Sequence, residues 1–542
     1  MKKNINGIFD SLSEKMPAFL SAVVIAFLVH CYKFTNNFPF FDSFYNFYSS
    51  QDMVASGRWF LSAACALSSY FDLPWLIGVF SVFFMAITAA VIADIFEIKN
   101  KYLMVLSSGL LVSFPAITET MFFAYTADGY MLAMLLAALC VWFSRMECMG
   151  KWKYTAAAVL CLCLACGIYQ CYVAFAFILA ICYFIGKLLD GSCETRVHVK
   201  WILHQAVVYL LGLAGYYVIW KLLLQGKGID AASYQGISGT GGSLLENGIL
   251  AAKNCIVSFV FFLLERNPLA QGWTVYSALS CLTAAVFVCL VCFGAGKGKV
   301  YKRPVDLLLL FLCLAVIPFG CYLCYFINPQ LAYYTRMVQC IAVLFIFTGV
   351  LCARWVQGRG KYLIFALLTA VILNHTVIAN VCYTYLDRSY EKSYSTMNEI
   401  AGRIHLEDDG TAKYIAFVGS FDVISEDADI DNSQLGTLGP LKIVSKAPVF
   451  YHDHMILFLS QYTDFTLSYY RTHQEPFPLV PISDNAPVPK GYTFRFPLAD
   501  EQTQNALLSS EEVAQMGIWP AKDSVKLIDE TIVVKLSQKA AW

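Results

Sequence analysis

Long apolar stretches dominate the first 385 residues, and short loops between them carry most of the charge. An α-helix needs about 20 mainly apolar residues to cross the hydrocarbon core of a bilayer, and each stretch is close to that length. The pattern predicts a polytopic α-helical membrane protein with about 11 transmembrane helices. The expected spans are 16–33, 73–96, 102–118, 126–144, 153–169, 171–188, 201–222, 274–293, 306–326, 337–354 and 362–385.

Two apolar regions do not read as one simple span. Residues 154–189 are too long for a single helix, and Tyr169-Gln170 offers a polar break where a tight hairpin fits. Residues 250–265 are short and carry charges near both ends. We therefore expect an interfacial or re-entrant helix there instead of a span.

Basic residues are concentrated in alternate loops. They occur before the first span and in every second loop after it. Because cytoplasmic loops of membrane proteins are enriched in Lys and Arg, these loops are expected inside. Eleven spans then place the N-terminus inside and the C-terminal segment outside. A further span at 250–265 would move the basic loop at 297–303 to the wrong side.

The composition changes near residue 387. Hydrophobic residues make up 58% of the whole chain and charged residues only 14%, whereas soluble domains average about 25% charged residues. Residues 388–542 carry a formal charge of −8, and the rest of the chain carries +8. We expect a multi-span membrane domain at 1–387 and a separate domain at 388–542. The acidic tail argues against nucleic acid as a partner.

The tail has mixed helix and strand patterns. Apolar residues recur at helical spacing from 390 to 404, residues 413–420 resemble a buried strand, and 524–536 predict a hairpin that turns at Asp529-Glu530. An extracytoplasmic α/β domain is therefore expected. The segment His452-Asp453-His454 has metal-ligand spacing, but alternation along a strand explains it more simply.

The first outer loop, residues 34–72, carries acids among aromatic residues. Asp42 lies a few residues beyond the expected membrane exit, and Asp52 precedes Arg58 and Trp59. A carboxylate at this depth can take the proton from a sugar hydroxyl as that hydroxyl attacks an activated anomeric carbon. Asp42 is our first candidate for this base. Asp52 is the second, because it could instead pair with Arg58 or cap the following helix.

A second outer loop is expected at residues 115–130. Glu119 and Asp128 flank an aromatic run there at the membrane edge. They could bind the acceptor or a divalent metal ion. For Asp128, the alternative is a helix N-cap that faces the helix dipole.

Two further polar sites fall at the same depth. Tyr169 and Gln170 mark the expected hairpin, and Tyr334 and Arg336 precede the expected span at 337–354. An arginine at headgroup level can bind a lipid phosphate while neighbouring aromatic rings flank its hydrocarbon tail. We favour Arg336 over Arg58 for that role, although an interfacial arginine can also simply extend toward the headgroups.

These segments also form an ordered set of motifs. The set comprises D-S-x-x-N-x-x-x-S-Q-D-x-x-x-x-G-R-W-F from Asp42, F-P-A-I-T-E-T-x-F-x-Y-x-x-D-x-Y-x-L-A from Phe114, and I-Y-Q from Ile168. It resembles the bacterial membrane glucosyltransferase-domain family, which includes glucosyltransferases that modify O-antigen and looks like a branch of the GT-C superfamily. The resemblance covers the whole membrane part.

The resemblance implies a GT-C-like fold and a multi-pass protein of the bacterial plasma membrane. It further implies transfer of a hexose, commonly glucose, from a polyprenyl-phosphate donor to a cell-envelope glycan at the outer face. A loop acid would serve as the base, which matches Asp42 or Asp52. Such families usually have two adjacent acids, whereas here the acids are ten residues apart.

Two other classes of function fit parts of the pattern. A lipid-linked saccharide flippase or other transporter would place charges within spans and would break or repeat helices. A membrane scaffold with a partner-binding outer domain would leave the clustered outer acids unexplained. We therefore expect a membrane glycosyltransferase.

Overall fold

The computed structural model describes residues 14–191, 193–232, 244–264, 274–412, 414–419, 452–462, 506–507 and 510–537. Contacts divide the chain into two compact units. The first, here called the membrane unit, contains residues 1–36, 50–381 and 436–441. The second, the C-terminal unit, contains residues 37–49, 382–435 and 442–542. The segment 37–49, although it is near the N-terminus in sequence, therefore belongs to the C-terminal unit.

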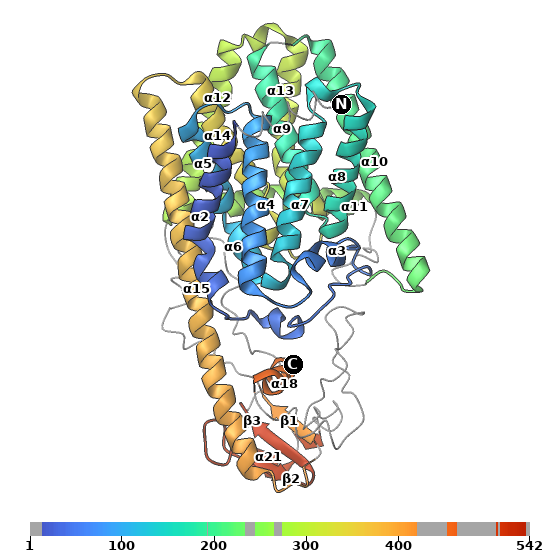
Figure 1. The fold of residues 1–542 in the computed structure, drawn as a ribbon, viewed down its shortest axis with the longest axis vertical. Helices are drawn as coiled ribbons and strands as arrows, with labels where there is room; N and C mark the ends of the chain where they lie inside the picture. Colours follow the sequence, from blue (N-terminus) through green and yellow to red (C-terminus); the bar gives the residue numbers. More distant parts are fainter. Residues whose placement is uncertain are drawn as a thin grey trace. The chain divides into compact units, whose positions relative to one another are not determined.

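The membrane unit is a bundle of long helices (Figure 1). In chain order these helices are α2 (Met16–Thr35), α4 (Pro74–Ile95), α5 (Lys101–Val112), α6 (Pro115–Phe122), α7 (Ala124–Phe143), α8 (Trp152–Ile168), α9 (Tyr172–Asp190), α10 (Thr195–Lys227), α11 (Leu244–Leu264), α12 (Val275–Lys297), α13 (Pro304–Cys321), α14 (Ile341–Trp355) and α15 (Arg359–Glu407). Short helical turns between them include α3 (Leu61–Cys65), η2 (Ala66–Ser68), η6 (Leu323–Phe326) and η7 (Thr335–Met337). α15 continues into the C-terminal unit.

Each of the eleven expected spans coincides with a helix or helix pair of the structure. Among the described residues, nine helices are long and apolar enough to cross a membrane, or ten if the bent pair α5–α6 counts as one span. The apolar helices α8 and α14 are shorter, and α11 is among the nine. These helices support a multi-pass membrane protein.

The prediction of a loop at residues 115–130 is wrong. Pro115 opens helix α6, and α7 begins at Ala124. Proline is well suited to the first turn of a helix, because its fixed φ is already helical and no N–H partner is needed there. A 44° bend between α5 and α6 separates the two helices. Glu119 and Asp128 are consequently both helical residues with buried side chains.

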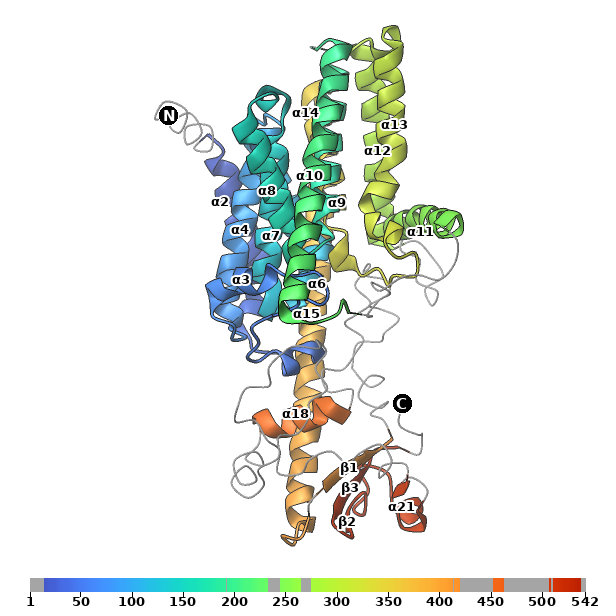
Figure 2. The same cartoon turned by 90° about the vertical axis from the view of Figure 1, so that its right-hand side faces the viewer.

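Helix α11 has the length and composition of a span. Its axis nevertheless lies across the direction of α12 and α13 in Figure 2. This orientation favours the interfacial or re-entrant prediction for residues 250–265. Two of its side chains and those of neighbouring helices enclose a cavity that is described below.

The C-terminal unit contains a small three-stranded sheet of order β1-β3-β2. β1 (Tyr414–Val418) pairs in parallel with β3 (Thr531–Lys535), and β3 pairs in antiparallel with β2 (Val525–Ile528). The terminal hairpin predicted from the sequence is therefore confirmed. Residues 452–462 form a helix, α18, and not the strand that the His-Asp-His pattern suggested.

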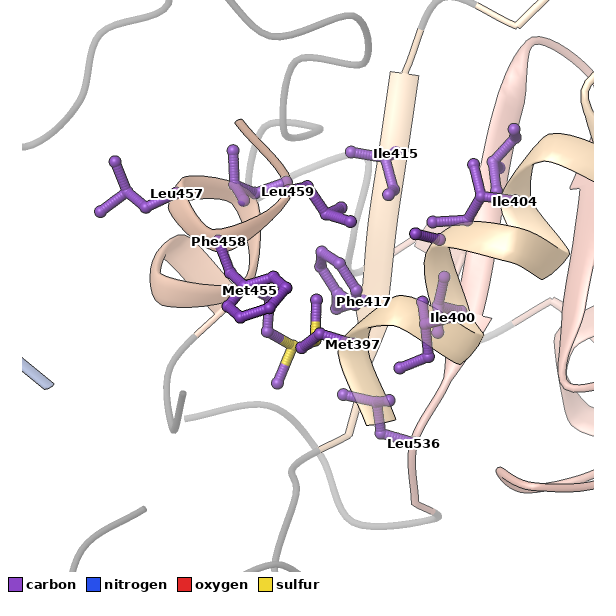
Figure 3. Packing of buried hydrophobic residues seen from close by; sticks show 14 of the residues in the cluster. Met397, Ile400, Ile404, Ile415, Phe417, Met455, Leu457, Phe458, Leu459 and Leu536 are labelled. Atoms are coloured by element: carbon purple, nitrogen blue, oxygen red, sulfur yellow. The ribbon is translucent and has the colours of Figure 1, made fainter. Parts of the chain in front are cut away.

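A hydrophobic core joins the sheet to two helices of this unit (Figure 3). The buried contributors include Met397, Ile400 and Ile404 of α15, Ile415 and Phe417 of β1, and Met455 and Phe458 of α18. Phe44 of the 3-10 helix η1 (Phe41–Tyr45) belongs to the same core. Burial of Phe44 explains why residues 37–49 group with the C-terminal unit.

Candidate functional site

A tight turn of the first loop carries Arg58. Met53 and Arg58 form an antiparallel bridge, and the Arg58 N–H donates to the Met53 carbonyl at 3.0 Å. Gly57 completes the turn with a φ of 79°, a conformation that favours glycine.

Side chains from two other segments fix this turn. The Gln170 amide donates to the Ser56 carbonyl at 2.9 Å and to the Tyr216 hydroxyl at 3.0 Å. The Trp220 indole donates to the Val54 carbonyl at 2.7 Å. Gln170 thus lies against the first loop, where it holds the backbone of the turn that carries Arg58.

Arg58 lies over a pair of stacked tyrosines. Its guanidinium carbon is 4.5 Å from the centre of the Tyr169 ring, and its Nη1 donates to the Tyr130 hydroxyl at 3.4 Å. The two tyrosine rings stack with centroids 4.9 Å apart. Within the described residues, Arg58 has no carboxylate partner, and its buried Nε has no hydrogen-bond acceptor.

Arg336 is held by Glu119. Its Nη1 donates to Glu119 Oε1 at 2.8 Å, and its backbone N–H donates to Glu119 Oε2 at 3.1 Å. The guanidinium also lies 4.2 Å from the Phe123 ring centre and 4.3 Å from that of Tyr334. Burial alone would lower the pKa of Arg336, but the Glu119 carboxylate outweighs it, and the pKa lies above its usual value.

The two arginines belong to one cluster. Arg58 and Arg336 are close enough to repel each other electrostatically, and both interact with Tyr169. Glu119 supplies the one carboxylate that the described residues pair with either guanidinium. The cluster therefore carries an excess positive charge in partly buried surroundings, which suits an anion such as a phosphate.

The two acids of the first loop are in different units. Asp52 belongs to the membrane unit and forms an ion pair with Lys227 at the end of α10. The carboxylate is 28% exposed, so it remains accessible. Asp42 lies in η1 of the C-terminal unit, two residues from the buried Phe44. The structure therefore groups Asp52, and not Asp42, with the arginines.

Trp59 and Asp128 both lie in the membrane unit. A side chain at Gly167 would collide with the Trp59 indole, whose buried Nε1 has no acceptor. One oxygen of Asp128 accepts the Gly129 N–H at 2.8 Å. Asp128 lies beyond the first turn of α7, so it is not the N-cap that the sequence allowed.

Sequence reasoning did not select several residues of this site. These are Tyr130, Tyr216, Trp220 and Lys227. Tyr130 lies within the motif that carries the family resemblance, and Lys227 is one of few basic residues in an outer loop, so both had a signal. Tyr216 and Trp220 lie in an ordinary apolar helix and had none.

No three His, Cys, Asp or Glu side chains in the described part of the chain are grouped so that they could hold a metal ion.

Comparison with known protein families shows which family the chain belongs to. The model of the family described as Glucosyl transferase GtrII matches residues 31–352, which is more than half of the chain. The chain belongs to this glucosyltransferase family. The matched region contains Asp42, Asp52, Glu119, Asp128 and both arginines of the cluster. No curated protein matches the chain.

Membership in the GtrII family confirms the resemblance drawn from the motifs and supports a glucosyltransferase role. The chain is therefore a transferase that is built on several apolar helices.

Proposed function

We propose that this GtrII-family protein transfers glucose from a polyprenyl-phosphate donor to a cell-envelope glycan at the outer face of a bacterial plasma membrane. The observation that carries the proposal is the arginine cluster: within the described residues, two guanidinium groups lie beside stacked aromatic rings, and only that of Arg336 is paired with a carboxylate. An anionic leaving group at the membrane surface needs such a partner.

Arg58 is the principal phosphate ligand in this proposal. Arg336 already has an ion-pair partner in Glu119, whereas Arg58 has unsatisfied donor capacity. Arg336 then adds positive charge to the cluster, and Glu119 orients the Arg336 guanidinium. This assignment reverses the order that the sequence suggested, because sequence alone could not reveal which arginine is neutralised.

The transfer itself is a single displacement. A base takes the proton of the acceptor hydroxyl, the hydroxyl oxygen forms a bond to the anomeric carbon, and the bond from that carbon to the phosphate oxygen breaks. The electron pair leaves with the polyprenyl phosphate, which is stable as an anion and needs no acid. Arginine charge at the phosphate stabilises the negative charge that develops there.

Asp52 is the base favoured by the structure, and Asp42 is the alternative. Asp52 is partly exposed, belongs to the same unit as Arg58 and directly precedes the Met53–Arg58 turn. The Lys227 ammonium beside it fixes the carboxylate. Asp128, which is buried and interacts with Ser68 of η2, would support the acceptor side of the site.

The opposite end of the bundle bears on the transporter alternative. Ion pairs there involve the ends of several helices: Asp94 with Arg145, Lys187 with Glu97 and Glu147, Asp190 with Arg354, and Asp306 with Arg303. Asp306 also shares a hydrogen bond with His198. A flippase must open at both ends in turn. Exposed ion pairs are individually weak, at about 0–1 kcal/mol each, but Asp306 and His198 are fully buried. This network favours a transferase that is open at one end.

A transfer assay in proteoliposomes tests the proposal. Purified protein should move labelled glucose from polyprenyl-phosphate glucose to lipid-linked glycan, and should not use UDP-glucose. Asp52→Asn serves as the inactive control. Transfer from the nucleotide sugar alone, or movement of the lipid donor across the bilayer without transfer, would refute the proposal.

A further inference from the structure

A cavity of about 230 Å³ lies within the membrane unit between α11, α12, α13 and α14. Its walls are almost wholly apolar and include the rings of Phe259, Phe287 and Phe345. Two of the few hydroxyls in the wall are already satisfied. Thr283 and Thr348 each donate to a carbonyl of their own helix at 2.8 Å. The cavity therefore offers hydrocarbon contacts and few polar ones.

The cavity reaches the lipid-facing side of the bundle. Val288 of α12 lines it and is 55% exposed, and Leu282 of α12 and Leu312 of α13 are also exposed, at 52% and 51%. In a membrane this surface contacts lipid chains. A hydrocarbon chain could therefore enter sideways, without crossing water.

The chain connects this cavity directly to Arg336. Ile341, the first residue of α14, lines the cavity. Its N–H donates to the Val338 carbonyl at 3.1 Å, and the Val338 N–H donates to the Thr335 carbonyl at 3.1 Å. Continuous turns thus run from the Arg336 segment to the cavity wall.

Helix α11 contributes Phe259 and Leu263 to the cavity and is attached to the segment that precedes Arg336. Asn254 donates to the Pro329 carbonyl at 2.8 Å, and Ser258 shares a hydrogen bond with the Tyr325 hydroxyl at 3.0 Å. Hydrogen bonds therefore hold α11 against the segment of chain that leads to Arg336.

We propose that this cavity binds the part of the donor's polyprenyl chain nearest to the phosphate. The inference rests on the proposed function, because it places the chain of the same donor whose phosphate contacts Arg58 and Arg336. Methyl branches and double bonds of an isoprenoid can pack against the three phenylalanine rings. A flexible acyl chain would fit them less closely.

The expected selectivity is modest for a physical reason. Hydrocarbon gains no hydrophobic free energy when it moves from lipid into an apolar cavity, so discrimination must come from packing contacts. We therefore expect filling of the cavity to weaken use of the donor by about three- to tenfold, which corresponds to a change below about 1.4 kcal/mol.

Two alanines on α12 provide a matched pair of variants. Ala284 lines the cavity, whereas Ala285 does not and faces outward on the same helix. Ala284→Phe should fill the cavity, and Ala285→Phe should add the same ring to the lipid-facing surface. Ala284→Leu is a smaller filling variant for the case in which the phenylalanine prevents folding.

The measurement is labelling by a polyprenyl phosphate that carries a photoreactive diazirine in its first isoprene units. The label should attach to α11, α12, α13 or α14 of the wild type and Ala285→Phe, and about three- to tenfold less to the Ala284 variants. The KM for polyprenyl-phosphate glucose should rise by the same factor in the Ala284 variants, with little change in kcat.

Three outcomes would overturn the inference. They are equal labelling of both alanine variants, labelling elsewhere in the protein, and equally effective competition by an ordinary phospholipid, which would make the cavity a bulk-lipid site. Failure of the proposed function is distinguishable, since wild-type protein would then transfer no glucose from any polyprenyl-phosphate donor, whatever the labelling result.

Discussion

Glu119 and Arg336, which are 217 residues apart in the chain, form an ion pair in which the Glu119 side chain is only 2% exposed. The pair joins α6 to the short turn η7. Breaking a buried pair by removal of one partner leaves the other charge uncompensated. Glu119 thus stabilises the fold by neutralising Arg336. Arg58 has no carboxylate partner among the described residues, so its removal leaves no buried carboxylate unpaired.

The first prediction separates these two tasks. Glu119→Ala should lower the free energy of unfolding by about 3–5 kcal/mol, because the Arg336 charge is left without its partner. Arg58→Ala should cost at most about 2 kcal/mol, the range of a cation–π contact. Arg58→Ala should also weaken binding of polyprenyl phosphate about ten- to a hundredfold, because it removes a charge-assisted hydrogen bond worth roughly 1.5–3 kcal/mol. Thermal unfolding in detergent and a direct binding assay measure the two effects.

Arg336→Lys is the control for this comparison. Lysine keeps the charge beside Glu119 but loses the planar fork of donors, so we expect stability near wild type and a measurable loss of donor binding. If Arg58→Ala binds the donor like the wild type and Arg336→Lys does not bind it, then Arg336 is the principal phosphate ligand.

The second prediction concerns the base. Asp52→Asn should reduce turnover by about 10²–10⁴-fold, since an amide keeps the shape of the carboxylate but cannot take a proton. Binding of the donor should hardly change. Asp42→Asn, the matched control from the same loop, should retain turnover, because the displacement needs one base and the proposed mechanism assigns that role to Asp52. The opposite pattern would make Asp42 the base, and two fully active variants would remove both acids from the mechanism.

The sequence was informative about elements and less so about pairing. Apolar length located a helix or helix pair at each expected span, because crossing a bilayer imposes that length on the chain. Helix α6 was missed because eight residues with polar members look like a loop when the tertiary partner is unknown. Arg58 and Arg336, which the sequence suggested as phosphate ligands, both lie against aromatic rings in the structure.

The pairing of charges could not be derived in the same way. Glu119 finds Arg336 across 217 residues, and Asp52 finds Lys227 across 175. No local periodicity links such positions, because only the packing of the helices brings them together. The placement of Asp42 likewise depends on Phe44 packing with α15 and α18.

The third prediction tests the turn that carries Arg58. A Cβ at Gly57 would collide with the Tyr216 hydroxyl and the Gln170 amide, and Gly57 has a φ of 79°. Gly57→Ala should therefore displace both side chains and reduce transfer. Gly228→Ala is the control, because Gly228 has a φ of 65° but nothing lies within 4 Å of its Cβ position. It should cost about 1 kcal/mol in backbone strain alone and should leave transfer near wild type. Equal activity of the two variants, measured with equal amounts of folded protein, would show that the turn does not position Arg58.

The fourth prediction is the membrane topology. Reporter fusions after residues 150, 230, 300 and 410 should report inside, outside, inside and outside. The first three positions follow the alternation of basic loops, and the fourth follows α15 (Arg359–Glu407) into the C-terminal unit. Helix α11 makes the test sharp, because it is long enough to span but lies across α12 and α13. If α11 crossed the membrane, residues 230 and 300 would report the same side. That result would place the basic loop at 297–303 outside and would leave the acidic C-terminal unit inside, away from any surface glycan.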